Sequence, residues 1–199
     1  MALEKVAEAG ITSIHWLATS QLDVVILRTL RKEKLPLRIY MIIPLTLLNS
    51  LDLAEDFNDE FARIGGVEVS LDGYLASGTA ALFQPYHSDS AVKGKLLCTP
   101  AKLRASANKI NKAGWQLVLH AMGDKAIETA LNTIEALKSK GRRRIDQAAL
   151  LNEELIHRIK QADVIVSVQP LVAASEFSVY SALEHLGAAR ARWLYPLKT

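Results

Sequence analysis

The chain has 199 residues, of which 50% are hydrophobic and 23% are charged, and its formal net charge is +3. That length is enough for one domain with a sizeable core. Cys98 is the only cysteine, which excludes an intrachain disulfide and a thiolate metal cluster.

Apolar periodicity alternates between strand and helix along the first part of the chain. Ser20 stands where it can cap a helix, and Gly65 with Gly66 is typical of a helix end. In chain order, these patterns predict strand 11–16, helix 20–34, strand 37–43, helix 50–64 and strand 67–72.

A long segment, residues 73–98, follows without clear periodicity, and its length indicates a functional excursion rather than an ordinary connection. Thr99 and Pro100 are typical of a helix start, and Asp124 can cap another helix. In chain order, the remaining patterns predict helix 99–114, strand 115–120, helix 124–141, strand 144–149, helix 152–162, strand 164–170 and helix 176–187.

This alternation of about six strand–helix units predicts an α/β fold with parallel strands, because most strands are continuous apolar runs. A doubly wound sheet and part of a (β/α)8 barrel both fit the pattern, and a whole barrel typically needs about 250 residues. No domain boundary is evident, so we expect a single domain over residues 1–199.

Two stretches bear on membrane and nucleic-acid partners. The apolar stretch "IYMIIPLTLL" is broken by Pro44 and falls short of the about 20 apolar residues that span a bilayer. The basic stretch "KSKGRRR" has no interleaved aromatic residues to stack on bases. The first ten residues include Glu4, Lys5 and Glu8, which argues against a signal peptide. We therefore expect a cytoplasmic protein with no membrane or nucleic-acid partner.

Several familiar motifs are missing. No Gly-x-Gly-x-x-Gly follows the first strand, and "GYLASGT" (73–79) has two glycines but no phosphate-binding lysine. No Gly-x-Ser-x-Gly elbow is present, which argues against a serine hydrolase of the α/β type.

Polar residues at the predicted strand ends are the candidate site, because ligands of α/β proteins bind beyond the carboxyl ends of the strands. A histidine and a carboxylate on neighbouring strand ends could hold a divalent metal. The alternatives stay open: His120 can hydrogen-bond a neighbouring loop, Glu68 can pair with an arginine, and Asp124 can simply cap its helix. The strand-end residues are His15, Glu68, Asp72, His120, Asp146, Gln147 and Gln169.

The chain resembles the metal-dependent amidohydrolases of the amidohydrolase-3 type over nearly its whole length. The most specific stretches are "VEVSLDGYLASGTAALFQPY", "GWQLVLHAMGDKAIETALNTIEAL" and "VIVSVQP". The resemblance implies a TIM barrel that holds a divalent metal, usually zinc, and hydrolyses non-peptide C–N bonds. It implies an incomplete (β/α)8 barrel here, with about six units corresponding to strands two to seven.

The resemblance also implies site residues. His120 matches a metal-binding histidine on the fifth strand, Glu68 stands where a bridging lysine is usual, and Gln147 replaces a histidine on the sixth strand. The metal candidates are therefore His120, Glu68 and Gln147. We predict that the motif residues Asp72, Gly73 and Gln169 contact a small amide-type substrate.

The departures from the family pattern predict weak or no hydrolysis by this chain alone. A His-x-His pair before the first predicted strand and an aspartate after "YPLKT" are absent, and that aspartate is the family's general base. The alternative is a non-catalytic α/β module that self-associates or binds partners through the open barrel edges.

Overall fold

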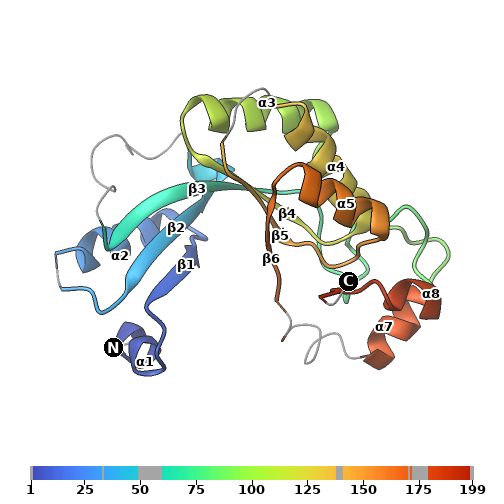
Figure 1. The fold of residues 1–199 in the computed structure, drawn as a ribbon, viewed down its shortest axis with the longest axis horizontal. Helices are drawn as coiled ribbons and strands as arrows, with labels where there is room; N and C mark the ends of the chain where they lie inside the picture. Colours follow the sequence, from blue (N-terminus) through green and yellow to red (C-terminus); the bar gives the residue numbers. More distant parts are fainter. Residues whose placement is uncertain are drawn as a thin grey trace. The chain divides into compact units, whose positions relative to one another are not determined.

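The computed structural model describes residues 2–32, 34–48, 60–137, 141–169, 171 and 179–197. The chain forms two compact units, Met1–Glu68 and Val69–Thr199, whose elements are labelled in Figure 1. Each unit is described separately below. Whether residues 1–199 form a single domain, as the sequence predicts, remains a prediction.

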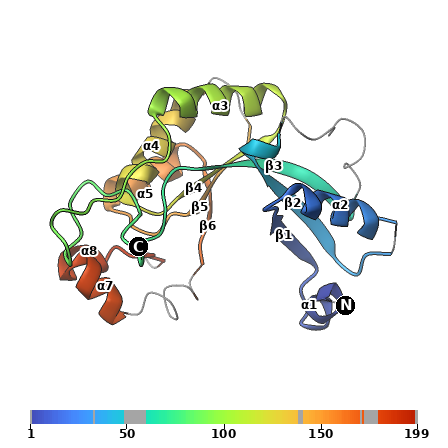
Figure 2. The same ribbon diagram turned by 180° about the vertical axis from the view of Figure 1, so that it is seen from behind.

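The first unit contains a parallel sheet that the helix α2 covers on one face. Strand β1 pairs in parallel with β2, and β2 pairs in parallel with β3. Figure 2 shows α2 against one face of these strands, where Val24 and Leu27 are buried. The elements are α1 (Ala2–Glu8), β1 (Ser13–Leu17), α2 (Gln21–Leu30), β2 (Arg38–Pro44), η1 (Leu45–Leu47) and β3 (Ala62–Ser70).

The predicted helix 50–64 is wrong for its last residues, because β3 already begins at Ala62; residues 49–59 lie outside the described part of the chain. Gly65 does not end a helix but lies within β3. A Cβ atom at Gly65 would lie 2.1 Å from the Tyr40 ring. The glycine therefore makes room for a neighbouring aromatic ring.

The second unit begins with a long connection that contains no helix or strand between Leu71 and Thr99, as the sequence predicts. Strand β4 then pairs in parallel with β5, and β5 with β6. The helix α4 packs against both β4 and β5, with α3 and α5 beside it. The elements are α3 (Pro100–Lys112), β4 (Gln116–Ala121), α4 (Asp124–Glu135), β5 (Arg143–Gln147), α5 (Glu153–Gln161), β6 (Ile165–Ser167), α7 (Val179–Leu186) and α8 (Ala188–Ala191).

The strand order β1-β2-β3-β4-β5-β6 follows the chain. The pairs β1–β2, β2–β3, β4–β5 and β5–β6 are all parallel. From Leu117 onward every residue of β4 is buried, as in a strand covered on both faces. Several boundaries differ from the prediction; β6, for example, covers Ile165–Ser167 rather than 164–170. Helix α4 ends at Glu135 rather than at residue 141, and its N-cap is Gly123 rather than Asp124.

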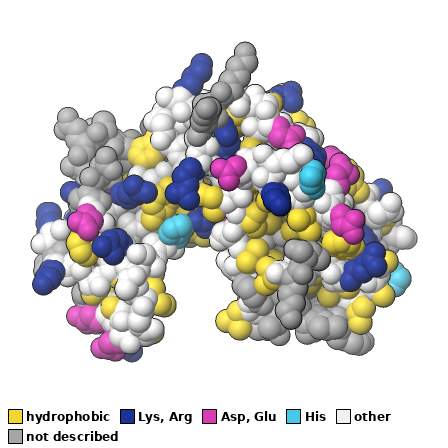
Figure 3. Space-filling model, viewed as in Figure 1, with side chains coloured by type: hydrophobic (Ala, Val, Ile, Leu, Met, Phe, Trp, Pro, Cys, Tyr) yellow, Lys and Arg dark blue, Asp and Glu magenta, His cyan; other side chains and the backbone are white. Residues whose placement is uncertain are grey.

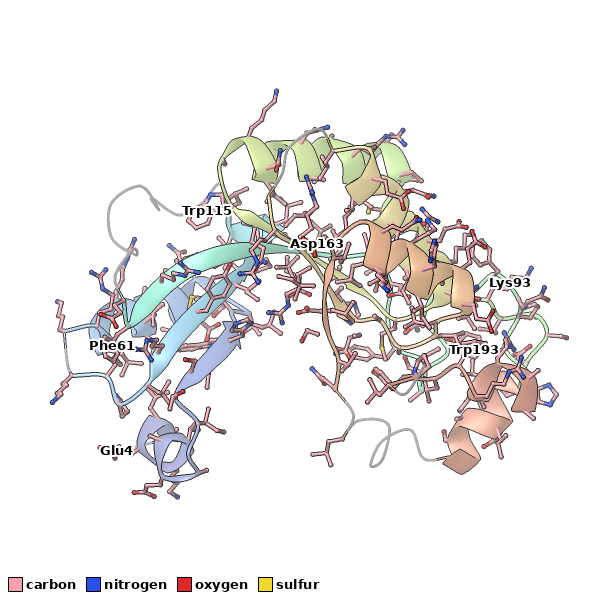
Figure 4. All side chains as sticks on the ribbon, in the orientation of Figure 1. Glu4, Phe61, Lys93, Trp115, Asp163 and Trp193 are labelled. Atoms are coloured by element: carbon pink, nitrogen blue, oxygen red, sulfur yellow. The ribbon has the colours of Figure 1, made fainter. Side chains whose placement is uncertain are left out.

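A cluster of buried residues lies beneath the loops of the second unit. It joins the long connection to α7 and to the segment after α8, and Trp193, labelled in Figure 4, packs against it. This cluster fixes the loops that follow β4 and β5. Its members are Leu75, Ala80, Leu82, Tyr86, Met122, Ala149, Leu150, Ala182, Leu186 and Tyr195.

Candidate active site

His120 lies near the carboxyl end of β4, where the buried apolar run delivers it to the strand end. Its side chain is buried, with 9% of the residue exposed. Neither ring nitrogen has a hydrogen-bond partner among the described residues. Buried polar atoms without partners are rare in native proteins and call for an explanation such as an ion or a ligand.

Asp72 is the buried carboxylate that shapes this strand end. Its Oδ2 accepts hydrogen bonds from the backbone N–H groups of Ala81 and Gly123, both at 2.9 Å. Its Oδ1 accepts one from the Met122 N–H at 3.0 Å. The same Oδ1 lies 3.9 Å from His120 Nδ1, too far for a hydrogen bond but close enough for attraction. Asp72 therefore positions the turn that follows His120.

The pKa of Asp72 is raised above its usual range, chiefly because burial disfavours the charged carboxylate. The N–H donors of Met122, Gly123 and Ala81 act in the opposite direction, and so does positive charge on His120. The carboxylate is thus held by hydrogen bonds in an environment that otherwise opposes ionisation.

The turn after His120 depends on Gly123. A Cβ atom there would lie 2.1 Å from the carbonyl oxygen of Ala81, a distance that side-chain movement cannot relieve. The next residue, Asp124, accepts hydrogen bonds from the N–H groups of Phe83 at 3.0 Å and Lys125 at 2.8 Å. Burial raises the pKa of Asp124. Asp124 therefore ties the long connection to the start of α4 instead of capping the helix.

Asp146 stands beside His120 in the parallel register of β4 and β5. Both of its carboxylate oxygens are engaged by the guanidinium of Arg144, through Arg144 Nε and, at 2.9 Å, through Nη2. Both residues are buried. A buried bidentate pair of this kind satisfies the carboxylate without any metal.

Gln147 pairs in register with Ala121 at the end of β5. Its Oε1 accepts a hydrogen bond from the Tyr195 hydroxyl at 3.1 Å, and burial raises the pKa of Tyr195 to about 12. Gln147 has φ 75° and Ala148 has φ 40°, which is costly backbone for residues with a Cβ. The strand exit is therefore held in an uncommon conformation.

Gly73 opens a tight turn that ends at Thr79. The Thr79 hydroxyl oxygen accepts the Tyr74 N–H at 2.8 Å, and a Cβ at Gly73 would meet the Thr79 side chain at 2.1 Å. The turn presents Tyr74 to the His120 ring, with ring centroids 5.6 Å apart and planes inclined at 58°.

Gln169 and Glu68 are two further residues that the sequence predicts for the site. Gln169 is exposed beyond the end of β6. Glu68 is half-buried and ends the first unit, where it pairs in register with Pro44. Sequence reasoning did not single out Arg144, Tyr74 or Tyr195 as site residues. The two-residue spacing of Arg144 and Asp146 on one strand is the signal that could have revealed their pairing, because such residues share a face.

A divalent metal fits this group only in part. The buried nitrogens of His120 are suited to one metal bond, but hydrogen bonds already engage the oxygens of Asp72 and Asp146. Across the residues that the structure describes, no three His, Cys, Asp or Glu side chains are placed to hold a metal ion. A catalytic zinc usually has three protein ligands, so these residues do not complete such a centre.

Two solved structures match this chain closely. They are titled as uncharacterized metal-dependent hydrolases from Pyrococcus furiosus and Pyrococcus horikoshii OT3. Their TM-scores are 0.89 and 0.88, each at 28% identity over 99% of this chain. The chain covers 42% and 40% of those structures. A Xaa-Pro dipeptidase structure at 14% identity and a TM-score of 0.55 supports the fold alone. The fold is α/β, and it corresponds to an incomplete TIM-type barrel.

Residues 1–199 match the family described as the Amidohydrolase family. The chain therefore belongs to the amidohydrolases, as the resemblance predicts. It is 28% identical over 168 residues to a putative amidohydrolase, YtcJ, of Bacillus subtilis, with 83% of this chain and 31% of that protein aligned. It is 31% identical over 116 residues to the protein LONG AFTER FAR-RED 3 of Arabidopsis thaliana, covering 56% of this chain and 20% of that protein. The chain thus spans less than a third of these relatives.

Proposed function

We propose that His120 is a ligand of a divalent metal, zinc, in hydrolysis of C–N bonds other than peptide bonds in small amide-type molecules. The observation that carries this proposal is the buried imidazole with two unpartnered nitrogens at a strand end. Leaving such a group unsatisfied costs about 1–3 kcal/mol, and a metal bond would satisfy one of the two nitrogens. Family membership and the metal-dependent hydrolases among the similar structures support the same assignment.

We assign Asp72 a positioning role in this function, because its carboxylate holds the backbone on both sides of the site. Gly73 supports the same arrangement by allowing the turn to close on Thr79. Glu68 and Gln147 remain proposed metal ligands, and Gln169 remains a proposed substrate contact. A glutamine oxygen is a weak ligand for zinc.

We further propose that the 199-residue chain alone hydrolyses amides weakly or not at all. The support is the shortage of free metal donors near His120: its nitrogens lack partners, but the carboxylates of Asp72 and Asp146 are engaged, and the described residues hold no group of three metal-ligating side chains. The distribution of charge on the surface does not indicate a nucleic-acid partner. On the face shown in Figure 3, Lys and Arg side chains lie in separate groups interspersed with Asp and Glu. No helix among the described residues is long and apolar enough to cross a membrane.

Equilibrium dialysis against zinc, followed by elemental analysis, tests the metal assignment. We expect His120→Ala to bind less zinc than the unmodified chain, because the proposed ligand is gone. His157→Ala, which removes an exposed histidine on α5, is the matched control and should bind as the unmodified chain does. Equal zinc binding by all three proteins would contradict the assignment.

The activity of the same preparations tests the second part of the proposal. Cyclic and N-acylated amides are incubated with the zinc-loaded chain, and amine release is measured. We expect at most slow turnover. Rapid turnover that disappears with a chelator and returns with zinc would overturn the proposal that this chain lacks a sufficient ligand set.

A further inference from the structure

The Tyr74 side chain is large and aromatic, yet 57% of the residue is exposed. Its backbone is nevertheless firmly held. Thr79 accepts the Tyr74 N–H, and the carbonyl of Tyr74 accepts hydrogen bonds from the N–H groups of Thr79 at 3.0 Å and Ala80 at 3.1 Å. A fixed backbone that presents an exposed aromatic ring is the arrangement of a binding surface, because little conformational freedom is lost when a ligand binds.

Tyr74 makes its ring contact with His120, the buried residue whose nitrogens lack partners. The two rings are inclined at 58°, so they do not stack face to face. Since more than half of Tyr74 is exposed, its ring retains surface for a second flat group. Aromatic rings favour offset-stacked or edge-on partners. The exposed phenol ring of Tyr74 therefore lies against an imidazole whose two nitrogens are buried and unpartnered.

We infer that Tyr74 is the residue that controls access to His120 and forms the aromatic wall against which a planar group of the bound molecule lies. This inference rests on the proposed function of His120. The ligand class is a planar amide that carries an aromatic or otherwise flat substituent. The polar atoms of such a ligand would meet the imidazole while its flat part stacks on the phenol ring. Tyr74 is thus a specificity-determining residue.

Histidine carbethoxylation with diethyl pyrocarbonate, followed by mass spectrometry of the peptides, tests the access role. The chain has five histidines, so the other four report on global unfolding in the same sample. We expect Tyr74→Ala to raise the modification rate at His120 about two- to tenfold, the population change that loss of an aromatic pair supports. Tyr74→Phe should match the unmodified chain, because the ring and not the hydroxyl makes the contact.

Phe83→Ala is the matched control, since Phe83 is another exposed aromatic residue of the second unit. It should leave the rate at His120 unchanged. The inference is overturned by an unchanged His120 rate in Tyr74→Ala. It is equally overturned by an increase as large in Phe83→Ala, or by a parallel increase at all five histidines.

Protection of His120 by a planar amide tests whether the Tyr74 ring forms the aromatic wall of the site. Benzamide should slow His120 modification in the unmodified chain and in Tyr74→Phe, but not in Tyr74→Ala. Cyclohexanecarboxamide, which lacks the flat ring, should protect less. Equal protection of Tyr74→Ala by benzamide would contradict the inference. Protection by added zinc tests the proposed function separately. If zinc does not protect His120, the metal role is contradicted, while the comparison of the Tyr74 variants can still be interpreted.

Discussion

The Asp72 carboxylate is shared by three backbone N–H groups from two segments that lie far apart in the chain. One of these segments contains Ala81, and the other contains Met122 and Gly123. The residue is 2% exposed, so water cannot replace these hydrogen bonds. The Asp-Gly motif drew attention to Asp72 as a substrate contact, but its partners could not be predicted, because they depend on a loop without periodicity.

Replacing Asp72 with Asn should destabilise the protein by roughly 2–3 kcal/mol, because one charged acceptor is lost and an amide NH2 would face backbone donors. Urea denaturation followed by circular dichroism measures the change. Asp89→Asn is the matched control, since exposed Asp89 accepts a single backbone N–H, from Ala91. A loss of similar size in both variants would contradict the anchoring role of Asp72.

Asp124 gives a prediction about pH. Its pKa is raised by burial in the folded state, so between the ordinary aspartate pKa and this raised value the folded protein binds more protons than the unfolded chain. Stability then falls as pH rises through that interval. We expect the unfolding free energy of the unmodified protein, relative to Asp124→Asn, to fall across this interval and to level off above it. Urea titrations at a series of pH values measure this difference, and an increase with pH would contradict the assignment.

At the scale of elements, the apolar periods predicted β1, β2, β4 and β5 to within a few residues, because buried parallel strands leave continuous apolar runs. The prediction failed at the start of β3. Gly65 resembles a helix end in sequence, and only the three-dimensional contact with Tyr40 explains its presence in a strand. Cross-strand packing of this kind has no signature in a single sequence.

The segment that follows β5 is likewise held by a contact that the sequence does not reveal. The family pattern pointed to Gln147, but the structure shows why its side chain is held: Tyr195, 48 residues later, donates a hydrogen bond to it. Positive φ values at Gln147, Ala148 and Tyr195 accompany this contact. Such backbone conformations cost of order 1–3 kcal/mol each, so the surrounding contacts must hold the exit in place.

Tyr195→Phe should therefore lower stability by about 1 kcal/mol and release the Gln147 amide. The side-chain amide signal of Gln147 in a nitrogen-15 NMR spectrum should shift in this variant. Tyr86→Phe is the matched control, because Tyr86 belongs to the same buried cluster and donates to the Ala80 carbonyl. It should lose similar stability without moving the Gln147 signal. An unmoved signal in Tyr195→Phe would contradict the holding role.

At the scale of the whole molecule, the amidohydrolase family and the barrel-type fold could both be predicted, because their motifs run in order along the chain. The ligand set could not be judged from sequence alone. A residue type at a matching position does not reveal whether its polar atoms are already engaged, as the oxygens of Asp146 are by Arg144. The Asp146 oxygens are therefore not free to bind a metal while Arg144 holds them.

Self-association is the whole-molecule prediction that remains. β1 stands at one end of the strand order, so among the described residues one of its edges has no neighbouring strand. An open strand edge can pair with another chain, and a charge on it disfavours such pairing. Leu17 on β1 is 42% exposed. We expect the chain to form a dimer of about twice the monomer mass at high concentration, and Leu17→Lys to shift it to monomer.

Sedimentation equilibrium over a range of concentrations measures the effect. Leu183→Lys is the matched control, because Leu183 is 43% exposed but belongs to the helix α7 and not to a strand. If the edge drives association, the same change of charge at Leu183 leaves the dimer intact, since net charge rises equally in both variants. A well-folded monomer at every concentration would remove edge pairing as a role for this chain. Equal dissociation of both variants would instead indicate that general charge repulsion, and not β1, determines the equilibrium.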